Sequence, residues 1–206
     1  MDKLKISDQE LDALREIGNI SAGQAAGAFS QLVSRKVNLS VPQARIVAVN
    51  ELGGFLSQGN IELAVHQRIL GDASGLMMTA LSNDAAFQLV DFLLQYGPEK
   101  RIRTSKTLTP MDEDMLTELG NILGGSYLTS LSKMTQMLFM PSVPHFTKNF
   151  TPSSLQALLS RNPAIDYAFV IFNELAIEKT KISLQVHLLP DPKTLPLILK
   201  AAGGPG

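Results

Sequence analysis

The sequence predicts an α/β protein of the α+β type, built from two similar halves that each contain a helix, strands and a closing helix. Two observations support this fold class. Within each half the spacing of hydrophobic residues changes from about 3.6, typical of a helix, to an alternation of 2, typical of a strand. In addition, a set of residues recurs at a fixed distance along the chain.

The recurrence is a repeat with an offset of 102 residues. An acidic residue, a glutamate, an asparagine and a proline occupy corresponding positions in both copies. These positions are Asp12, Glu16, Asn19 and Pro42 in the first copy and Asp114, Glu118, Asn121 and Pro144 in the second (114−12, 118−16, 121−19 and 144−42 all equal 102). A period this long is typical of a duplicated half-domain rather than of a solenoid.

We therefore predict a single domain over residues 1–206, with a pseudo-two-fold relation between its halves. The two repeats cover about 7–97 and 109–201, with a linker at 98–108 and a disordered tail at 202–206.

Each half is expected to open with a long helix, over residues 8 to about 34 and 110 to about 133. Ser7 and Glu10 have the spacing of a capping box, and Thr109 repeats this start with a proline at the first helical position. Glycine inside a helix costs about 1 kcal/mol relative to alanine. The many glycines of these helices therefore predict that other parts of the chain pack closely against them: Gly18, Gly23, Gly27, Gly120, Gly124 and Gly125.

Strands and shorter helices follow each long helix. Alternating hydrophobic and polar residues predict antiparallel strands with one packed face. The expected strands cover 61–69, 76–81, 167–177 and 182–188, with a turn at 71–75. The expected helices cover 51–57, 83–96, 152–160 and 193–201.

Composition excludes several classes of function. A formal charge of −1 lacks the bulk attraction that non-specific nucleic-acid binding needs. The absence of cysteine excludes disulfides and thiolate nucleophiles. No window approaches the roughly 18 apolar residues of a membrane helix, and the first residues lack the apolar run of a signal peptide. We expect a soluble cytoplasmic protein with no nucleic-acid partner and no membrane insertion.

The repeated residues form a polar helix face in each copy, because positions i, i+4 and i+7 of a helix lie within a narrow arc. An amide beside a carboxylate can hold a water molecule in line with an electrophile, as in phosphoryl transfer. The glutamate can pair with a cation on the molecule that carries the electrophile. The alternative is a solvated face whose acids complement the helix dipole; recurrence in both copies favours function.

Other conspicuous residues have simpler interpretations. His66, His145 and His187 lack ligand spacing and are expected on the surface or on sheet faces. The methionines are expected to fill gaps in the core: Met77, Met78, Met134, Met137 and Met140. The basic residues near position 100 are expected in an exposed connection: Lys100, Arg101, Arg103 and Lys106.

The pattern acid–x3–Glu–x2–Asn–x22–Pro, present twice, resembles the signature of the CheC/CheX/FliY phosphatases of bacterial and archaeal chemotaxis. Two sites in a chain of this size resemble the CheC type most closely. The resemblance implies two motif helices side by side on an antiparallel sheet. It also implies an aspartyl-phosphate phosphatase that acts on the phosphorylated response regulator CheY.

The resemblance also implies a role for each repeated residue. Asn19 and Asn121 would orient the attacking water, and Glu16 and Glu118 would contact a lysine of CheY, without a covalent intermediate. Asp12 and Asp114 would support them, while Pro42 and Pro144 would shape the helix-to-strand region. No cofactor of its own is expected, since Mg²⁺ would belong to CheY.

Two questions about function remain open from the sequence. A non-catalytic adaptor could bind phosphorylated CheY, or a flagellar switch or receptor component, through the same helices; alternatively, one half alone could be active. CheC proteins commonly pair with the deamidase CheD. Residues 149–159 differ from the acidic and hydrophobic segment expected to dock CheD, so this partner stays open.

Overall fold

The computed structural model describes residues 8–96, 107–161, 165–177 and 180–201. Its helices are α1 (Asp8–Val33), α2 (Val49–Gln58), α3 (Asn83–Tyr96), α4 (Pro110–Thr135), α5 (Pro152–Leu159) and α6 (Thr194–Ala201). Its strands are β1 (Asn38–Ala48), β2 (Leu63–Gly71), β3 (Gly75–Leu81), β4 (Phe139–Pro141), β5 (His145–Lys148), β6 (Tyr167–Ile177) and β7 (Thr180–Pro190). This mixture of helices and antiparallel strands confirms the predicted fold class.

The seven strands form one antiparallel sheet in the order β1-β6-β7-β3-β2-β4, with β5 also pairing with β2. The two halves interlock within this sheet. The outer strand β1 of the first half pairs with β6 of the second, and β4 and β5 of the second half pair with β2 of the first. Strands from both repeats are therefore neighbours at each of the two edges of the sheet. The domain and repeat boundaries given above stay a prediction.

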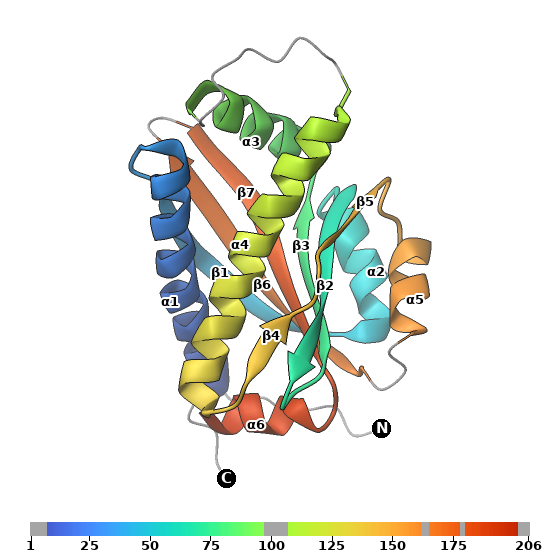
Figure 1. The fold of residues 1–206 in the computed structure, drawn as a ribbon. Helices are drawn as coiled ribbons and strands as arrows, with labels where there is room; N and C mark the ends of the chain where they lie inside the picture. Colours follow the sequence, from blue (N-terminus) through green and yellow to red (C-terminus); the bar gives the residue numbers. More distant parts are fainter. Residues whose placement is uncertain (1–7, 97–106, 162–164, 178–179, 202–206) are drawn as a thin grey trace.

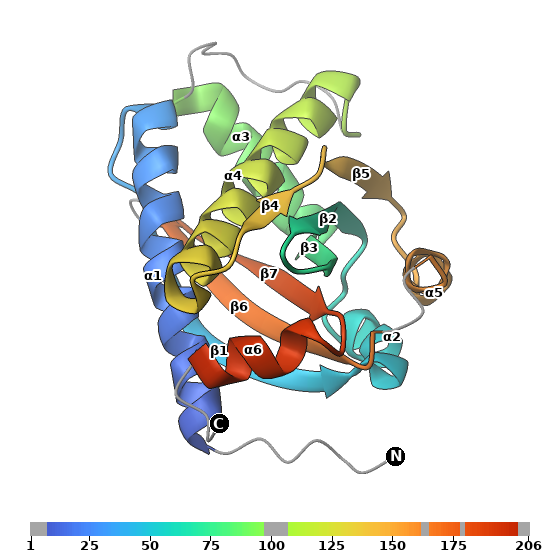
Figure 2. The same ribbon diagram turned by 60° about the horizontal axis from the view of Figure 1, so that its bottom comes forward.

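Helices cover both faces of the sheet. Helices α1 and α4 cross one face side by side, with α3 and α6 near its two ends, and α2 and α5 lie against the opposite face (Figures 1 and 2). The expectation that only one face would be packed is therefore wrong. All seven residues of β3 are buried, and the polar side chains of Gln185 and His187 in β7 are buried beneath the α2 layer.

Helix α4 begins as its capping signal predicts. In α4 the Thr109 hydroxyl accepts a hydrogen bond from the Asp112 amide, and the Asp112 carboxylate accepts one from the Thr109 amide at 2.8 Å. Pro110 occupies the first turn, where a missing N–H group costs nothing. The corresponding prediction for Ser7 in α1 lies outside the described residues, as do the basic segment around residue 100 and the tail at 202–206.

Close packing against the helix backbones is confirmed for three glycines. A Cβ atom on Gly120 would lie 2.6 Å from Val65 Cβ, and one on Gly124 would lie 2.5 Å from Gln67 Oε1. For Gly18 the nearest atoms would be methyl groups of Val41 and Ile171 at 3.3 Å. The prediction is wrong for the other three, since nothing lies within 4 Å of such a Cβ atom on Gly23, Gly27 or Gly125.

The outer strands β1, β4 and β5 were not predicted from the sequence. Pro42 lies in β1 where the pairing register shifts between Ser40 and Gln43, and Pro144 lies in the gap between β4 and β5. Proline lacks the N–H group that a strand ladder needs, so it occurs at edges and bulges. The repeated prolines thus lie in the edge segments that follow the two motif helices, at a register shift within β1 and between β4 and β5. Their role in shaping the helix-to-strand region stays a prediction.

The methionines and histidines differ in how deeply they are buried. Met77 and Met78 are buried as expected, whereas Met140 is 44% exposed because it lies on the outer strand β4. His66 and His145 lie opposite each other on β2 and β5, while His187 is fully buried. None of the described helices has both the length and the apolar composition that crossing a bilayer requires.

Candidate functional site on two helix faces

The first copy of the motif lies fully on the surface of α1. Asp12, Glu16 and Asn19 are all exposed, and Asp12 forms an ion pair with Arg15 of the same helix at 3.5 Å. Within the described part of the chain, the Asn19 amide has no hydrogen-bond partner. Ile20, next to it, is also exposed and adds an apolar contact surface beside the polar side chains.

The second copy lies on α4 and is held more firmly. Asp114 and Glu118 are exposed, but Asn121 is half-buried. The side-chain nitrogen Nε2 of Gln67, on β2, donates hydrogen bonds to Asn121 Oδ1 at 3.0 Å and to the backbone carbonyl of Ser142 at 3.1 Å. Asn121 is thus linked to the segment that carries the repeated proline.

The two motifs occupy opposite ends of the helix pair. Helices α1 and α4 run in opposite directions across the sheet, as the colours in Figure 1 show. Each motif belongs to the first half of its own helix. The chain therefore presents two separate polar faces rather than one combined site.

Gln67 is a site residue that the sequence analysis missed. It stands in β2 at a position where the alternation of Leu63, Val65 and Ile69 predicts another apolar side chain. Its side chain is 2% exposed. A polar residue in the buried phase of a strand needs an internal hydrogen-bond partner, and this signal could have identified it.

The chemistry available on these faces comes from carboxylates and amides. A carboxylate can accept hydrogen bonds from a cation, and a carboxamide can both donate and accept. Within the ranges that the structure describes, no group of three or more histidine, aspartate or glutamate side chains could hold a metal ion.

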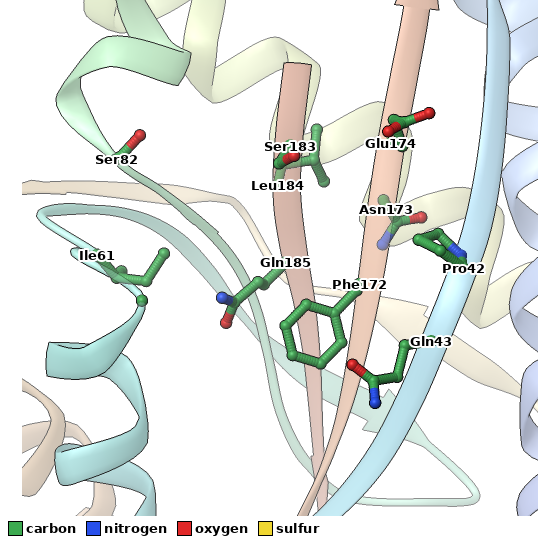
Figure 3. A pocket seen from close by; sticks show the side chains of 11 residues that line it. Pro42, Gln43, Ile61, Ser82, Phe172, Asn173, Glu174, Ser183, Leu184 and Gln185 are labelled. Atoms are coloured by element: carbon green, nitrogen blue, oxygen red, sulfur yellow. The ribbon is translucent and has the colours of Figure 1, made fainter. Parts of the chain in front are cut away.

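Two cavities lie elsewhere on the described part of the chain. The cavity in Figure 3, of about 260 Å³, lies on the α2 side of the sheet, with Phe172, Gln43 and Gln185 among its lining side chains. Pro42 is the one repeated residue that lines it. A second cavity, of about 430 Å³, lies between β5 and α5. None of the four repeated Glu and Asn residues lines either cavity.

The second cavity contains a pair of histidines. The rings of His66 and His145 stack with centroids 5.6 Å apart, and the Thr147 hydroxyl lies 3.3 Å from His66 Nε2. Burial, together with the nearby His145 and Arg161, lowers the pKa of His66. This pair lies at the edge of the sheet, in the cavity on the α5 side.

Glu16, Asn19 and Glu118 therefore lie exposed on helix surfaces outside both cavities, and Asn121 is half-buried beside them. A side chain on such a surface cannot enclose a small molecule, because ligand pockets are concave. It can, however, enter a cavity of another macromolecule. The geometry thus favours a protein partner that carries the reacting group in its own pocket.

Comparison with known proteins identifies relatives of the whole chain. The CheC-like family model matches twice, over residues 10–46 and 111–147, which are the segments that carry the repeat. The CheY-P phosphatase CheC of Bacillus subtilis is 31% identical over 202 residues, covering 96% of both chains.

Solved structures share the fold. The crystal structure of Thermotoga maritima FliY superposes with a TM-score of 0.77 at 20% identity, covering 97% of this chain and 98% of that one. A chain in the crystal structure of a CheX–CheY–BeF3–Mg²⁺ complex from Borrelia burgdorferi has a TM-score of 0.50 at 14% identity, with coverage of 92% of this chain and 99% of that one.

Proposed function

We propose that this chain, which belongs to the CheC-like family, hydrolyses the phosphoryl group from the aspartate of phosphorylated CheY. Its relative of 31% identity is named for this activity. A protein of the same fold, CheX, has been crystallised with CheY, BeF3 and Mg²⁺. We further propose that the chain acts in the cytoplasm.

One observation supports the proposal above the others: a glutamate and an asparagine recur together, exposed or half-exposed, on two helix faces. In the proposed reaction, Asn19 or Asn121 enters the CheY site and orients a water molecule. The water oxygen bonds to phosphorus as the bond from phosphorus to the aspartate oxygen breaks. The products are inorganic phosphate and the free carboxylate of CheY.

The other motif residues assist this step. Glu16 and Glu118 pair with a lysine of CheY and so fix the orientation of the two proteins. Asp12 and Asp114, one turn earlier, support the acidic face. Mg²⁺ belongs to CheY, so the chain contributes only positioning and hydrogen bonding.

The test is a phosphate-release assay with phosphorylated CheY and Mg²⁺. We expect the wild-type chain to shorten the lifetime of phosphorylated CheY and the double variant Asn19→Ala/Asn121→Ala to leave it at CheY's own rate. The matched control is Asn50→Ala, which alters an exposed asparagine on the opposite face of the sheet. Retained binding of phosphorylated CheY without any acceleration by the wild type would instead support the adaptor. Loss of acceleration in only one single variant would show that one half alone is active.

CheD is a second partner to test in the same system. The segment at 149–159 forms α5 and its preceding turn, apart from both motif helices. If CheD binds there, adding CheD should change the phosphate-release rate of the wild-type chain. This change should persist in each single asparagine variant.

A further inference from the structure

We propose that Gln67 is a positioning residue for the second site, which fixes the carboxamide of Asn121 in a single orientation. This inference rests on the proposed function, because it assigns Gln67 a role in the same reaction. It is carried by the two hydrogen bonds of Gln67 Nε2 and by the packing that confines its side chain.

The backbone carbonyl of Ser142 fixes the orientation of the side-chain amides of Gln67 and Asn121. The Ser142 carbonyl can only accept a hydrogen bond, so the atom of Gln67 that faces it at 3.1 Å must be the donor Nε2. The second hydrogen of Nε2 is directed at the Asn121 side chain at 3.0 Å. The atom of Asn121 that receives it must therefore be the acceptor Oδ1. Consequently Nδ2 occupies the other end of the Asn121 amide.

Gln67 itself has little freedom to move. It is 2% exposed and pairs with Met77 across the β2–β3 ladder. Its Oε1 lies against Gly124 of α4, where an added Cβ atom would stand only 2.5 Å away. The missing side chain of Gly124 therefore makes room for the Gln67 amide beneath the helix.

The arrangement leaves Asn121 the groups that the reaction needs. A carboxamide oxygen has two lone pairs, and Gln67 occupies one of them. No other group among the described residues bonds the Asn121 amide, so the second lone pair and both Nδ2 hydrogens stay available for the attacking water and a phosphoryl oxygen. An amide that is already oriented loses less rotational freedom between the bound complex and the transition state, so its orientation affects kcat. Asn19, which has no such partner within the described residues, must become ordered on binding.

The test isolates the second site by placing each variant in an Asn19→Ala background. Gln67→Met keeps the length of the side chain but removes both donors. Gly124→Ala keeps the donors but displaces the Gln67 amide. The matched controls are Gln58→Met, which alters an exposed glutamine on α2 at the opposite face, and Gly125→Ala, where an added Cβ atom would meet nothing within 4 Å.

We expect Gln67→Met and Gly124→Ala each to lower kcat for release of phosphate from CheY roughly three- to tenfold. KM should change little, because the Glu118 contact that docks CheY is intact. The two controls should stay within about twofold of the background rate. In an Asn121→Ala background, where the first site acts alone, Gln67→Met should have no effect.

Three outcomes would overturn the inference while leaving the proposed function standing. These are an unchanged kcat in Gln67→Met, an equal loss in both asparagine backgrounds, and a second site that is inactive by itself. A wild-type chain that never accelerates phosphate release would instead refute the proposed function.

A measurement on the wild-type chain covers the case in which the variants fail to fold. By NMR, the side-chain amide protons of Gln67 should exchange with solvent much more slowly than those of Gln31, which is exposed on α1. Equal exchange rates at the two residues would overturn the inference.

Discussion

The two halves of the molecule carry the same motif but support it differently. On α1 the motif is wholly exposed, and Asn19 makes no internal hydrogen bond among the described residues. On α4 Asn121 is half-buried and bonded to Gln67. The outer strands differ as well: β1 is continuous with Val41 buried, whereas β4 and β5 are separated and Val143 is 75% exposed. The helix-face chemistry is thus shared, while the support beneath it is particular to each half.

The largest expected difference concerns activity. Removing a group that stabilises the reacting atoms costs roughly 10²- to 10³-fold at its own site. If the oriented amide of Asn121 makes its site the faster one, Asn121→Ala should reduce phosphate release at least about threefold more than Asn19→Ala. Phosphate release from CheY with each single variant measures this. Equal losses would show that support beneath the helix does not affect catalysis.

The next difference concerns stability. Gly120→Ala places a Cβ atom 2.6 Å from Val65 Cβ, which forces the strand or the helix to shift, and we expect a loss of about 2 kcal/mol. Gly18→Ala meets only methyl groups at 3.3 Å, and alanine gains about 1 kcal/mol in helix propensity, so its stability should stay near that of the wild type. Urea unfolding measures both. Similar losses in the two variants would contradict this difference in packing.

The third prediction concerns the pH dependence of stability, which we expect from a buried histidine at the centre of the sheet. His187 on β7 pairs with Met78 on β3, and both side chains are fully buried. Burial lowers the pKa of His187 from 6.5 to about 3, so below pH 6.5 the unfolded chain binds a proton that the folded chain does not. Stability is therefore lost as pH falls, by about 2 kcal/mol between pH 7 and pH 5.

The variant His187→Met should remove this part of the pH dependence, since it places on β7 the residue that β3 already carries. His145→Gln, which changes an exposed histidine, is the matched control and should leave most of the slope. Urea unfolding at several pH values measures it. An unchanged slope in His187→Met would show that other groups cause the loss.

The smallest expected difference concerns ion pairs. Lys148 on β5 contacts Glu113 on α4 at 2.6 Å, whereas Arg15 and Asp12 pair within α1 at 3.5 Å. Exposed pairs contribute roughly 0 to 1 kcal/mol and less at high salt. Glu113→Gln should therefore cost under about 1 kcal/mol, and Asp12→Asn less still. Thermal unfolding at low and high salt would detect this order, and a larger cost for Asp12→Asn would reverse it.

The sequence predicted the helices well because their signals are local. The capping residues of α4 and the helical spacing of hydrophobic residues placed both long helices within about two residues of their observed ends. The outer strands were missed because proline and charged residues interrupt their alternation, as at Pro42 and Arg45 in β1. The packing of the second face was missed because Gln185 and His187 are polar yet buried.

The candidate site likewise has one part that the sequence predicts and one part that it does not. Its helix faces follow from the spacing of three residues on one helix, which the sequence contains directly. The link from Gln67 to Asn121 depends on how β2 of one half lies beneath α4 of the other. The two residues are 54 positions apart in the sequence, so only the tertiary structure brings them into contact.

The irregular outer strands have a consequence for how two molecules can contact each other. An open sheet offers unpaired N–H and C=O groups at its edges, and another chain can pair with them. Here the shift at Pro42 distorts one edge, and the gap at Pro144 divides the other. Short or bent edges of this kind are poor templates for a further strand. The two prolines that mark the duplication in the sequence therefore also mark the points where each sheet edge is least suited to pair with another chain.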